Sequence, residues 1–211
     1  MASETVHVVD DEPQVLKSLG RLLRASGWEV AHHSSAQEFL ARADRAGGCV
    51  LLDYDMPGMN GLELQAAMAA RGGRWKIVFL TGRADIPTSV QAMKEGAVDF
   101  LVKPADRHQI LAAVERALAA LRAERAHQEQ VEDVARRVSA LSPRERQVMG
   151  YVIAGKLNKQ IAESLGTAEK TVKIQRARVM RKMGVSSVAG LVRITERAGI
   201  EPVVETAPLE A

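Results

Sequence analysis

The chain has only one cysteine, Cys49, among its 211 residues. A single cysteine excludes an intramolecular disulfide. Cys49 begins a short apolar run, 49–52, that is typical of a buried strand. We therefore expect this thiol to fill the core of the protein.

Long hydrophobic runs are also lacking. No apolar stretch approaches the roughly 18 residues that a helix needs to span a bilayer, and the mean hydropathy is −0.10. Residues 1–5 lack a basic region followed by an apolar stretch, so we expect no secretory signal. Without an export signal or a disulfide, we expect a cytoplasmic protein that does not associate with a membrane.

Acidic residues are scarce towards the C-terminal end. Residues 139–197 contain twelve basic side chains and four acidic ones, a formal charge of +8. Because the whole chain carries only +3, the remainder must carry −5. An acidic part joined to a basic part suggests two domains with different partners, as the length also allows.

The first half of the chain alternates between strand patterns and helix patterns. Such alternation implies a parallel sheet with helices on both faces. The predicted strands are 5–9, 28–32, 49–52, 76–80 and 99–102.

Polar side chains stand where four of these strands end. They are Asp10 and Asp11, Asp53, Thr81, and Lys103. In open α/β sheets this edge is where ligands bind. Each residue alone also fits a cap, a turn or a salt bridge, but five suitable types at four strand ends favour one shared site.

The chemistry of this set points to phosphoryl transfer. Three carboxylates repel one another unless a cation joins them, and oxygen ligands with room for water suit Mg²⁺. A carboxylate such as that of Asp53 can act as a nucleophile and form an aspartyl phosphate. A lysine and a hydroxyl would then bind the transferred group.

Together, Asp10-Asp11, Asp53, Thr81 and Lys103-Pro104 resemble the phosphoacceptor site of a two-component receiver domain. The resemblance covers residues 3–122, and we assign 1–122 to this domain. It implies a flavodoxin-like α/β fold with a five-stranded parallel sheet in the order 2-1-3-4-5. It also implies that a sensor histidine kinase phosphorylates Asp53.

The same resemblance assigns further roles. Asp11 and Asp53 would hold Mg²⁺ directly, Asp10 through water, and Asp55 through its backbone carbonyl. Thr81 and Lys103 would bind the phosphoryl oxygens, and the Lys103–Pro104 bond is often cis in such domains. Phe100 matches an aromatic residue that turns inward with Thr81 on activation.

One class of enzyme shares part of this pattern. The Asp53-x-Asp55 pair is similar to the motif of haloacid-dehalogenase-type phosphatases. Those enzymes have threonine or valine where this chain has Pro57, and their acidic pair comes late in the chain. Here Asp10 and Asp11 come early, so the sequence favours the receiver.

Glycine and proline are absent between Asp106 and Pro143. The segment begins with an apolar stripe that predicts packing on the sheet, and 122–130 is polar on every face, as in an interdomain bridge. We expect one long helix, 106–138, with 123–138 as a linker. The alternative is two helices with a flexible joint near His127. The polar middle argues against a continuous coiled coil between two chains.

The remaining residues predict four helices. Ser142, Pro143 and Glu145 form a capping box with proline in the first turn. Asn158 is expected to cap a short helix, 159–165, and Thr167 a longer one, 168–183. Ser186 or Ser187 begins a last helix. A short helix, a glycine-containing turn and a longer basic helix are typical of a helix-turn-helix.

This segment resembles the LuxR-type DNA-binding domain, and the whole chain resembles a response regulator of the FixJ/NarL family. The residues that carry the resemblance are 141–145, 158–162 and 171–173. We assign 139–200 to this all-α domain and expect 201–211 to be a disordered tail.

By that resemblance, the longer helix enters the major groove and its basic residues neutralise phosphates. Lys173, Ile174 and Ala177 would face the groove, and Lys170, Arg176 and Arg178 would contact the backbone. Gln175 replaces a usual histidine; it can bond adenine, but we favour a backbone or structural role. The last helix would mediate dimerisation through Val188, Leu191 and Val192.

The sequence thus predicts a transcription regulator controlled by phosphorylation, which pairs as a homodimer on a two-fold promoter site in double-stranded DNA. Its only catalysis would be its own phosphoryl transfer and autodephosphorylation. The alternative is a constitutive dimeric DNA-binding protein whose receiver does not switch.

Asp55 gives a first test. Its side chain lies two residues past the nucleophile, close to the metal and to any attacking water, so we predict that it tunes the lifetime of the phosphoryl group. Asp55→Asn should change the dephosphorylation rate, measured on radiolabelled protein. Equal rates for the variant and the wild type would contradict the prediction.

Overall fold

The five predicted strands form one parallel sheet in the computed structural model, which describes residues 4–43, 47–82 and 86–202. The strand order is β2-β1-β3-β4-β5, as predicted, and all neighbours are parallel. The strands are β1 (Thr5–Val9), β2 (Glu29–His33), β3 (Gly48–Leu52), β4 (Trp75–Thr81) and β5 (Asp99–Val102).

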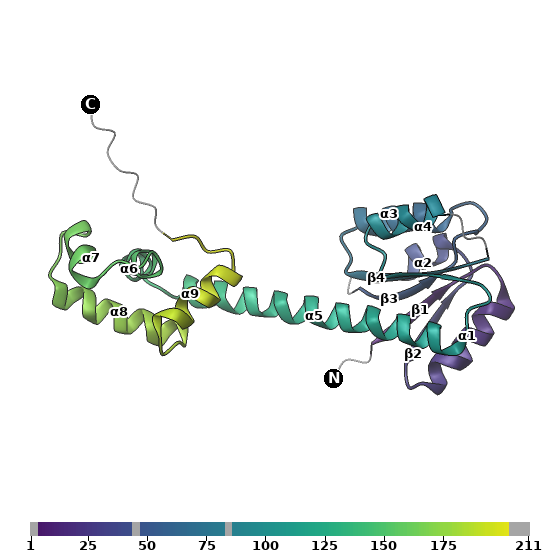
Figure 1. The fold of residues 1–211 in the computed structure, drawn as a ribbon, viewed down its shortest axis with the longest axis horizontal. Coiled ribbons are helices and arrows are strands. Elements are labelled where there is room, and N and C mark those ends of the chain that lie inside the picture. Colours follow the sequence, from purple (N-terminus) through teal and green to yellow (C-terminus); the bar gives the residue numbers. More distant parts are fainter. Residues whose placement is uncertain (1–3, 44–46, 83–85, 203–211) are drawn as a thin grey trace, which may run out of the picture. The chain divides into compact units, whose positions relative to one another are not determined.

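Helices cover both faces of this sheet, so each face has its own core. One core includes Leu23, Leu51 and Leu118, and the other includes Phe39, Leu64 and Phe79. Figure 1 shows α1 and α5 on one face and α2, α3 and α4 on the other. These helices are α1 (Pro13–Ala25), α2 (Ala36–Arg42), α3 (Gly61–Ala70), α4 (Ile86–Lys94) and the first part of α5 (Arg107–Ser139).

Cys49 is a core residue, as predicted. It is fully buried in β3, and burial raises the pKa of its thiol to about 12. Such a thiol stays protonated at neutral pH and is a poor nucleophile.

The loop between β3 and α3 is tight because Gly61 lies against its start. A Cβ atom at Gly61 would lie 2.7 Å from the backbone oxygen of Asp53. The amide of Gly61 also donates to the carbonyl of Tyr54 at 2.9 Å. Asn60 and Glu63 then cap α3 reciprocally. The end of β3 is therefore held in place by the start of α3.

Helix α5 is continuous from Arg107 to Ser139, so the predicted alternative of a joint near His127 is wrong. Its first part buries Ala113, Val114 and Leu118 against the sheet. Within the described part of the chain, neither α5 nor another helix is apolar over a length that could cross a membrane.

Contacts divide the chain into two compact units, Met1–Arg125 and Ala126–Ala211. The end of α5 belongs to the second unit, because Val134 and the following Leu141 are buried in its core. These two residues are among the apolar residues that would pair two chains in a coiled coil. Here they are instead buried within one chain.

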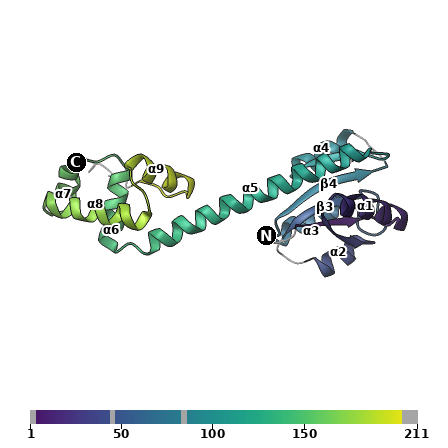
Figure 2. The same cartoon turned by 90° about the horizontal axis from the view of Figure 1, so that it is seen from below.

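The second unit is all helical in its described part, which ends at residue 202. Figure 2 shows its short helices gathered together beside the end of α5. Its core contains Val148, Ile161, Val172 and Leu191. Of the expected tail 201–211, residues from 203 onward lie outside the described part. The helices are α6 (Pro143–Ile153), α7 (Asn158–Ser164), α8 (Glu169–Met183) and α9 (Val188–Arg197).

The predicted cap of α7 is wrong. Asn158 is the first residue of the helix, and Leu157 is its N-cap. The side chain of Asn158 is used elsewhere, because its Oδ1 accepts a hydrogen bond from Nη1 of Arg176 at 3.0 Å. At the start of the helix, Oε1 of Gln160 accepts a hydrogen bond from the amide of Leu157 at 2.8 Å instead.

The cap of α8 also differs from the prediction. Ala168, not Thr167, is the N-cap, and no side chain caps this end. Gly184 ends α8 with φ of 67°, a left-handed conformation that glycine adopts without strain. Ser187 caps α9 through a bond from the amide of Gly190, in keeping with the prediction.

The capping box of α6 extends into an ion pair between the buried Glu145 and the exposed Lys182. Oε2 of Glu145 accepts from Nζ of Lys182 at 2.6 Å and from the amide of Ser142 at 2.8 Å. The bond from Lys182, followed by that from Ser142, lowers the pKa of Glu145 to about 2. The pair joins the start of α6 to the end of α8.

We predict that Glu145→Gln destabilises the second unit at neutral pH. The folded pKa lies below the unfolded value of 4.5, so the stabilisation is complete above that value and is lost as pH falls towards 2. Urea unfolding of both proteins, followed by circular dichroism from pH 7 downward, measures this difference. The control is Glu163→Gln, an exposed change on α7. A difference that does not shrink in acid would contradict the prediction.

Candidate functional site

The carboxyl ends of the central strands bring the predicted polar residues together. Asp53 directly follows β3, and its amide donates to the carbonyl of Val9 in β1 at 2.9 Å. Asp10 is 2% exposed and Asp53 is 6% exposed. Thr81 ends β4 and is fully buried. Asp11 is exposed, so the pocket opens to solvent on its side.

Lys103 joins two of the carboxylates. Its Nζ lies 2.7 Å from Oδ2 of Asp10 and 3.1 Å from Oδ1 of Asp53. Its backbone amide donates to the carbonyl of Thr81 at 2.7 Å, and the Lys103–Pro104 bond is cis. The other oxygen of Asp10, Oδ1, accepts from the amide of Glu12. The lysine is thus aimed into the pocket from the end of β5.

The pocket holds more negative charge than Lys103 can neutralise. Burial raises the pKa of Asp53, and the neighbouring Asp10 and Asp11 raise it further, against the effect of Lys103. Burial alone would lower the pKa of Lys103, but its bonds to Asp10 and Asp53 raise it. Three carboxylates and one ammonium leave a formal charge of −2.

This arrangement fits a divalent cation. One oxygen each from Asp10, Asp11 and Asp53 lies within 4.8 Å of the others. Hard oxygen donors with one solvent-exposed side suit Mg²⁺, which retains several waters. A divalent ion would also neutralise the remaining charge of −2. The structure therefore brings together the three carboxylates predicted from the sequence.

Two other predicted residues lie at the margin of this pocket. Asp55 is exposed in the loop after β3. Phe100, in β5, is half-buried and packs beside Phe79 with ring centroids 5.8 Å apart. Its predicted movement inward with Thr81 stays a prediction.

The second unit presents the predicted DNA-binding residues on α8. Lys170, Lys173 and Arg178 are exposed, and Val172, Val179 and Met183 on the same helix are buried in the core. Ile174 is 48% exposed. Ala177 is also exposed, which suits its predicted place at the groove. The helix therefore separates a basic outer face from an apolar inner face.

Two residues of this face are less accessible than the others. Arg176 is half-buried and bonded to Asn158, as described above. The amide oxygen of Gln175 is buried, and the described residues offer it no hydrogen-bond partner. In this conformation that oxygen is not presented to a base, and the role of Gln175 stays a prediction.

One predicted dimerisation residue needs correction. Leu191 has no exposed surface, because it lies in the core of the second unit. It cannot contact a second chain without unfolding this core. Val188 and Val192 are half-buried on α9 and remain the accessible part of the predicted surface.

Comparison with known families covers both units. Residues 6–115 match the family described as response regulator receiver domain. Residues 139–195 match the luxR family of bacterial regulatory proteins. The chain is also 44% identical over 205 residues to the transcriptional regulatory protein FixJ of Azorhizobium caulinodans, covering 96% of this chain and 97% of that protein.

The chain belongs to the response-regulator family. It is of the FixJ/NarL type, with a receiver domain and a LuxR-type helix-turn-helix domain, as the residue patterns predicted. A further relative is the response regulator protein TodT of Pseudomonas putida, 41% identical over 196 residues, which are 92% of this chain and 86% of that protein.

Solved structures agree with this assignment. The response regulator StyR is 42% identical with a TM-score of 0.82, and the match covers 93% of this chain and all of that one. Full-length FixJ from B. japonicum is 39% identical with a TM-score of 0.58, over 95% of this chain and 99% of that one. This response regulator therefore shares both domains with these relatives.

The structure also shows a surface that sequence reasoning missed. Val90 and Met93 on α4 and Val102 on β5 are large apolar side chains exposed by 45–47%. Val90 and Met93 are three residues apart on one helix, so they share a face. Spacing alone does not reveal whether such a face is covered by the rest of the fold.

We predict that the acidic pocket binds Mg²⁺ through Asp11 and Asp53. Asp11→Asn should weaken Mg²⁺ binding by about tenfold or more, because even the loss of a supporting residue costs that much at a metal site. Glu29→Gln is the matched control, since it removes an exposed carboxylate at the start of β2, away from the carboxyl ends of the strands. Calorimetric titration measures both, and unchanged affinity in Asp11→Asn would refute the site.

Proposed function

We propose that this response regulator receives a phosphoryl group on Asp53 from a sensor histidine kinase, and that phosphorylation makes two copies pair on a two-fold DNA site. The observation that supports it most is the pocket itself. A buried carboxylate lies at a strand end, 3.1 Å from the ammonium of Lys103 and beside two further carboxylates.

In the proposed transfer, an Oδ atom of Asp53 attacks the phosphorus of a phosphohistidine. The O–P bond forms as the P–N bond breaks, and the electron pair remains on the histidine nitrogen of the kinase. Lys103 leaves Asp53 and binds a phosphoryl oxygen, and the Thr81 hydroxyl donates to another. Asp11 and Asp53 would hold a Mg²⁺ ion, which would supply positive charge for the transferred oxygens.

Phosphorylation of Asp53 would also change the conformation of the receiver. A phosphoryl group adds a dianion to a pocket whose far side is formed by Thr81 and Lys103. Moving Thr81 toward it opens space behind β4, and the half-buried Phe100 of the neighbouring strand is placed to fill that space. We infer that this rearrangement reshapes the surface of α4 and β5.

That surface is suited to pairing. Its three exposed apolar residues, Val90, Met93 and Val102, lie on α4 and on the edge strand of the sheet. Exposed apolar area of this kind marks interaction sites. We therefore place the switched contact between receivers here, and we place a second contact at Val188 and Val192.

The DNA-binding unit supplies the output. Exposed Lys170, Lys173 and Arg178 suit phosphate contacts, and the apolar Ile174 suits the methyl group of thymine in the major groove. Pairing presents two α8 helices to two half-sites, about one helical turn apart.

Beryllofluoride, which mimics a phosphoryl group on aspartate, tests the proposal. With Mg²⁺ and beryllofluoride, the wild type should double in mass by light scattering and bind a promoter duplex more tightly. Asp53→Asn should do neither, because the mimic needs the carboxylate. Met93→Gln should lose the mass change, while the control Lys94→Gln on the same helix keeps it.

The outcomes separate the two functions considered. A wild type whose mass and duplex affinity ignore beryllofluoride would contradict the proposal. If that protein is dimeric throughout, the constitutive DNA-binding function is supported instead.

A further inference from the structure

The end of the linker helix α5 and the end of the recognition helix α8 cap each other. Nη1 of Arg137, on α5, donates to the carbonyl of Met183, the last residue of α8, at 2.7 Å. Nζ of Lys182, on α8, donates to the carbonyl of Ala140, just past the end of α5, at 3.1 Å. Each helix therefore supplies a cation to the C-terminal end of the other.

Both contacts satisfy groups that a helix leaves without partners. The last four carbonyls of an α-helix have no intrahelical donor, and the negative end of the helix dipole attracts cations. Arg146 adds a third such bond, from its Nη2 to the carbonyl of Val138 at 3.2 Å. The two helix ends are thus joined by charge-assisted bonds, which are stronger than neutral ones.

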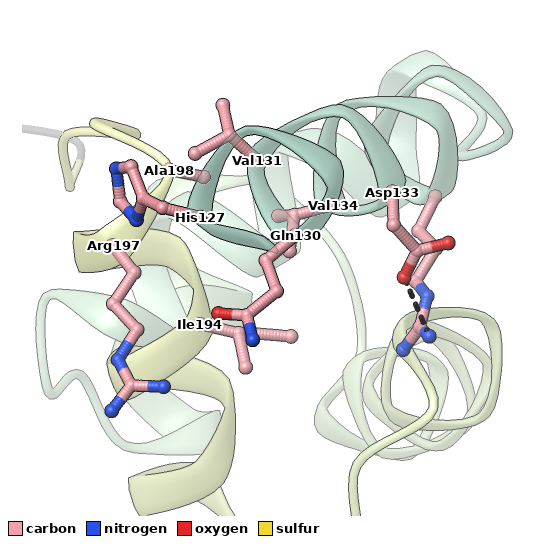
Figure 3. Close-up of a pocket in the computed structure, with 9 residues that line it drawn as sticks. His127, Gln130, Val131, Asp133, Val134, Ile194, Arg197 and Ala198 are labelled. Atoms are coloured by element: carbon pink, nitrogen blue, oxygen red, sulfur yellow. Dashed lines mark ion pairs between the residues drawn. The ribbon is translucent and has the colours of Figure 1, made fainter. Parts of the chain in front are cut away.

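Arg137 is itself oriented by its own helix. Its Nη2 lies 2.7 Å from Oδ2 of Asp133, one turn earlier on α5, and Figure 3 shows this ion pair as a dashed line. One guanidinium therefore bonds α5 and α8 at once. Gly184 leaves room for it, because a Cβ atom there would lie 2.7 Å from Nη1.

The contact of α5 with α9 is different in kind. A groove of about 180 Å³ separates parts of the two helices. In Figure 3, Val131 and Val134 on α5 lie beside this groove, with Ile194 on α9 and Ala198 at the end of that helix. The end of α5 is therefore bonded directly to α8, while part of its contact with α9 borders an open groove.

We propose that Arg137 is a positioning residue that fixes the recognition helix α8 to the linker helix α5, so that a movement of α5 moves α8. Helix α5 begins in the receiver unit and ends in the DNA-binding unit. The bond of Arg137 would therefore couple a change in the receiver to the helix that binds DNA. The inference rests on the proposed function for its biological role.

The bond itself is tested in the unphosphorylated full-length protein. In Arg137→Gln, amide hydrogen exchange at residues 180–185 should rise by about tenfold, the effect of losing one charge-assisted hydrogen bond. The control is Arg136→Gln, which removes the same charge one residue earlier, where the ion pair found among the described residues is with Asp133. Equal exchange in both variants would overturn the proposal.

The coupling is tested by the ratio of duplex affinities with and without beryllofluoride and Mg²⁺. The ratio in Arg137→Gln should fall towards one, while Arg136→Gln keeps the wild-type ratio. Arg137→Lys, which still donates to the carbonyl of Met183, should recover part of it. A loss of stability alone would weaken both affinities and leave their ratio unchanged.

The two experiments distinguish two kinds of failure. A wild-type ratio above one that survives in Arg137→Gln overturns the positioning role alone. A wild-type ratio of one refutes the proposed function, and the exchange experiment then decides by itself whether Arg137 fixes α8 to α5.

Discussion

The receiver is built around one ammonium group that faces an excess of negative charge, most of it buried. Lys103 bridges Asp10 and Asp53, and Asp11 completes a set whose formal charge is −2. Charges of one sign that are buried this closely raise the free energy of the folded state unless they are matched. A divalent cation fits this requirement, because it would remove the excess.

The sheet makes this concentration of charge possible. Parallel strands bring their carboxyl ends to one edge, so residues more than forty positions apart, such as Asp10 and Asp53, meet there. Two apolar cores, one on each face, hold the strands in register. The close approach of Gly61 to the backbone of Asp53 fixes the loop that follows. The sheet thus positions the carboxylate of Asp53 beside Asp10 and Lys103.

In the second unit, charged side chains bond the backbone groups that helix ends leave without partners. Glu145, Lys182 and Arg137 satisfy backbone groups at the start of α6 and at the ends of α5 and α8. Their charges also link three helices that sequence alone treats as separate. The C-terminal end of the linker helix α5 is therefore part of the DNA-binding unit.

Local patterns in the sequence determined much of this protein. The spacing of apolar residues and the caps at Ser142 and Asn60 set where helices begin, and the residue types at four strand ends identified Asp10, Asp11, Asp53 and Lys103. Alternation implied a parallel sheet, but the order of its strands came from the family resemblance. Only the tertiary structure decided which faces are covered: Leu191 is buried, Met93 is exposed, and Asn158 bonds Arg176 instead of capping α7. It also brought Arg137 to Met183, because a contact between residues far apart in the chain depends on how helices pack, and periodicity within one helix carries no information about its neighbour.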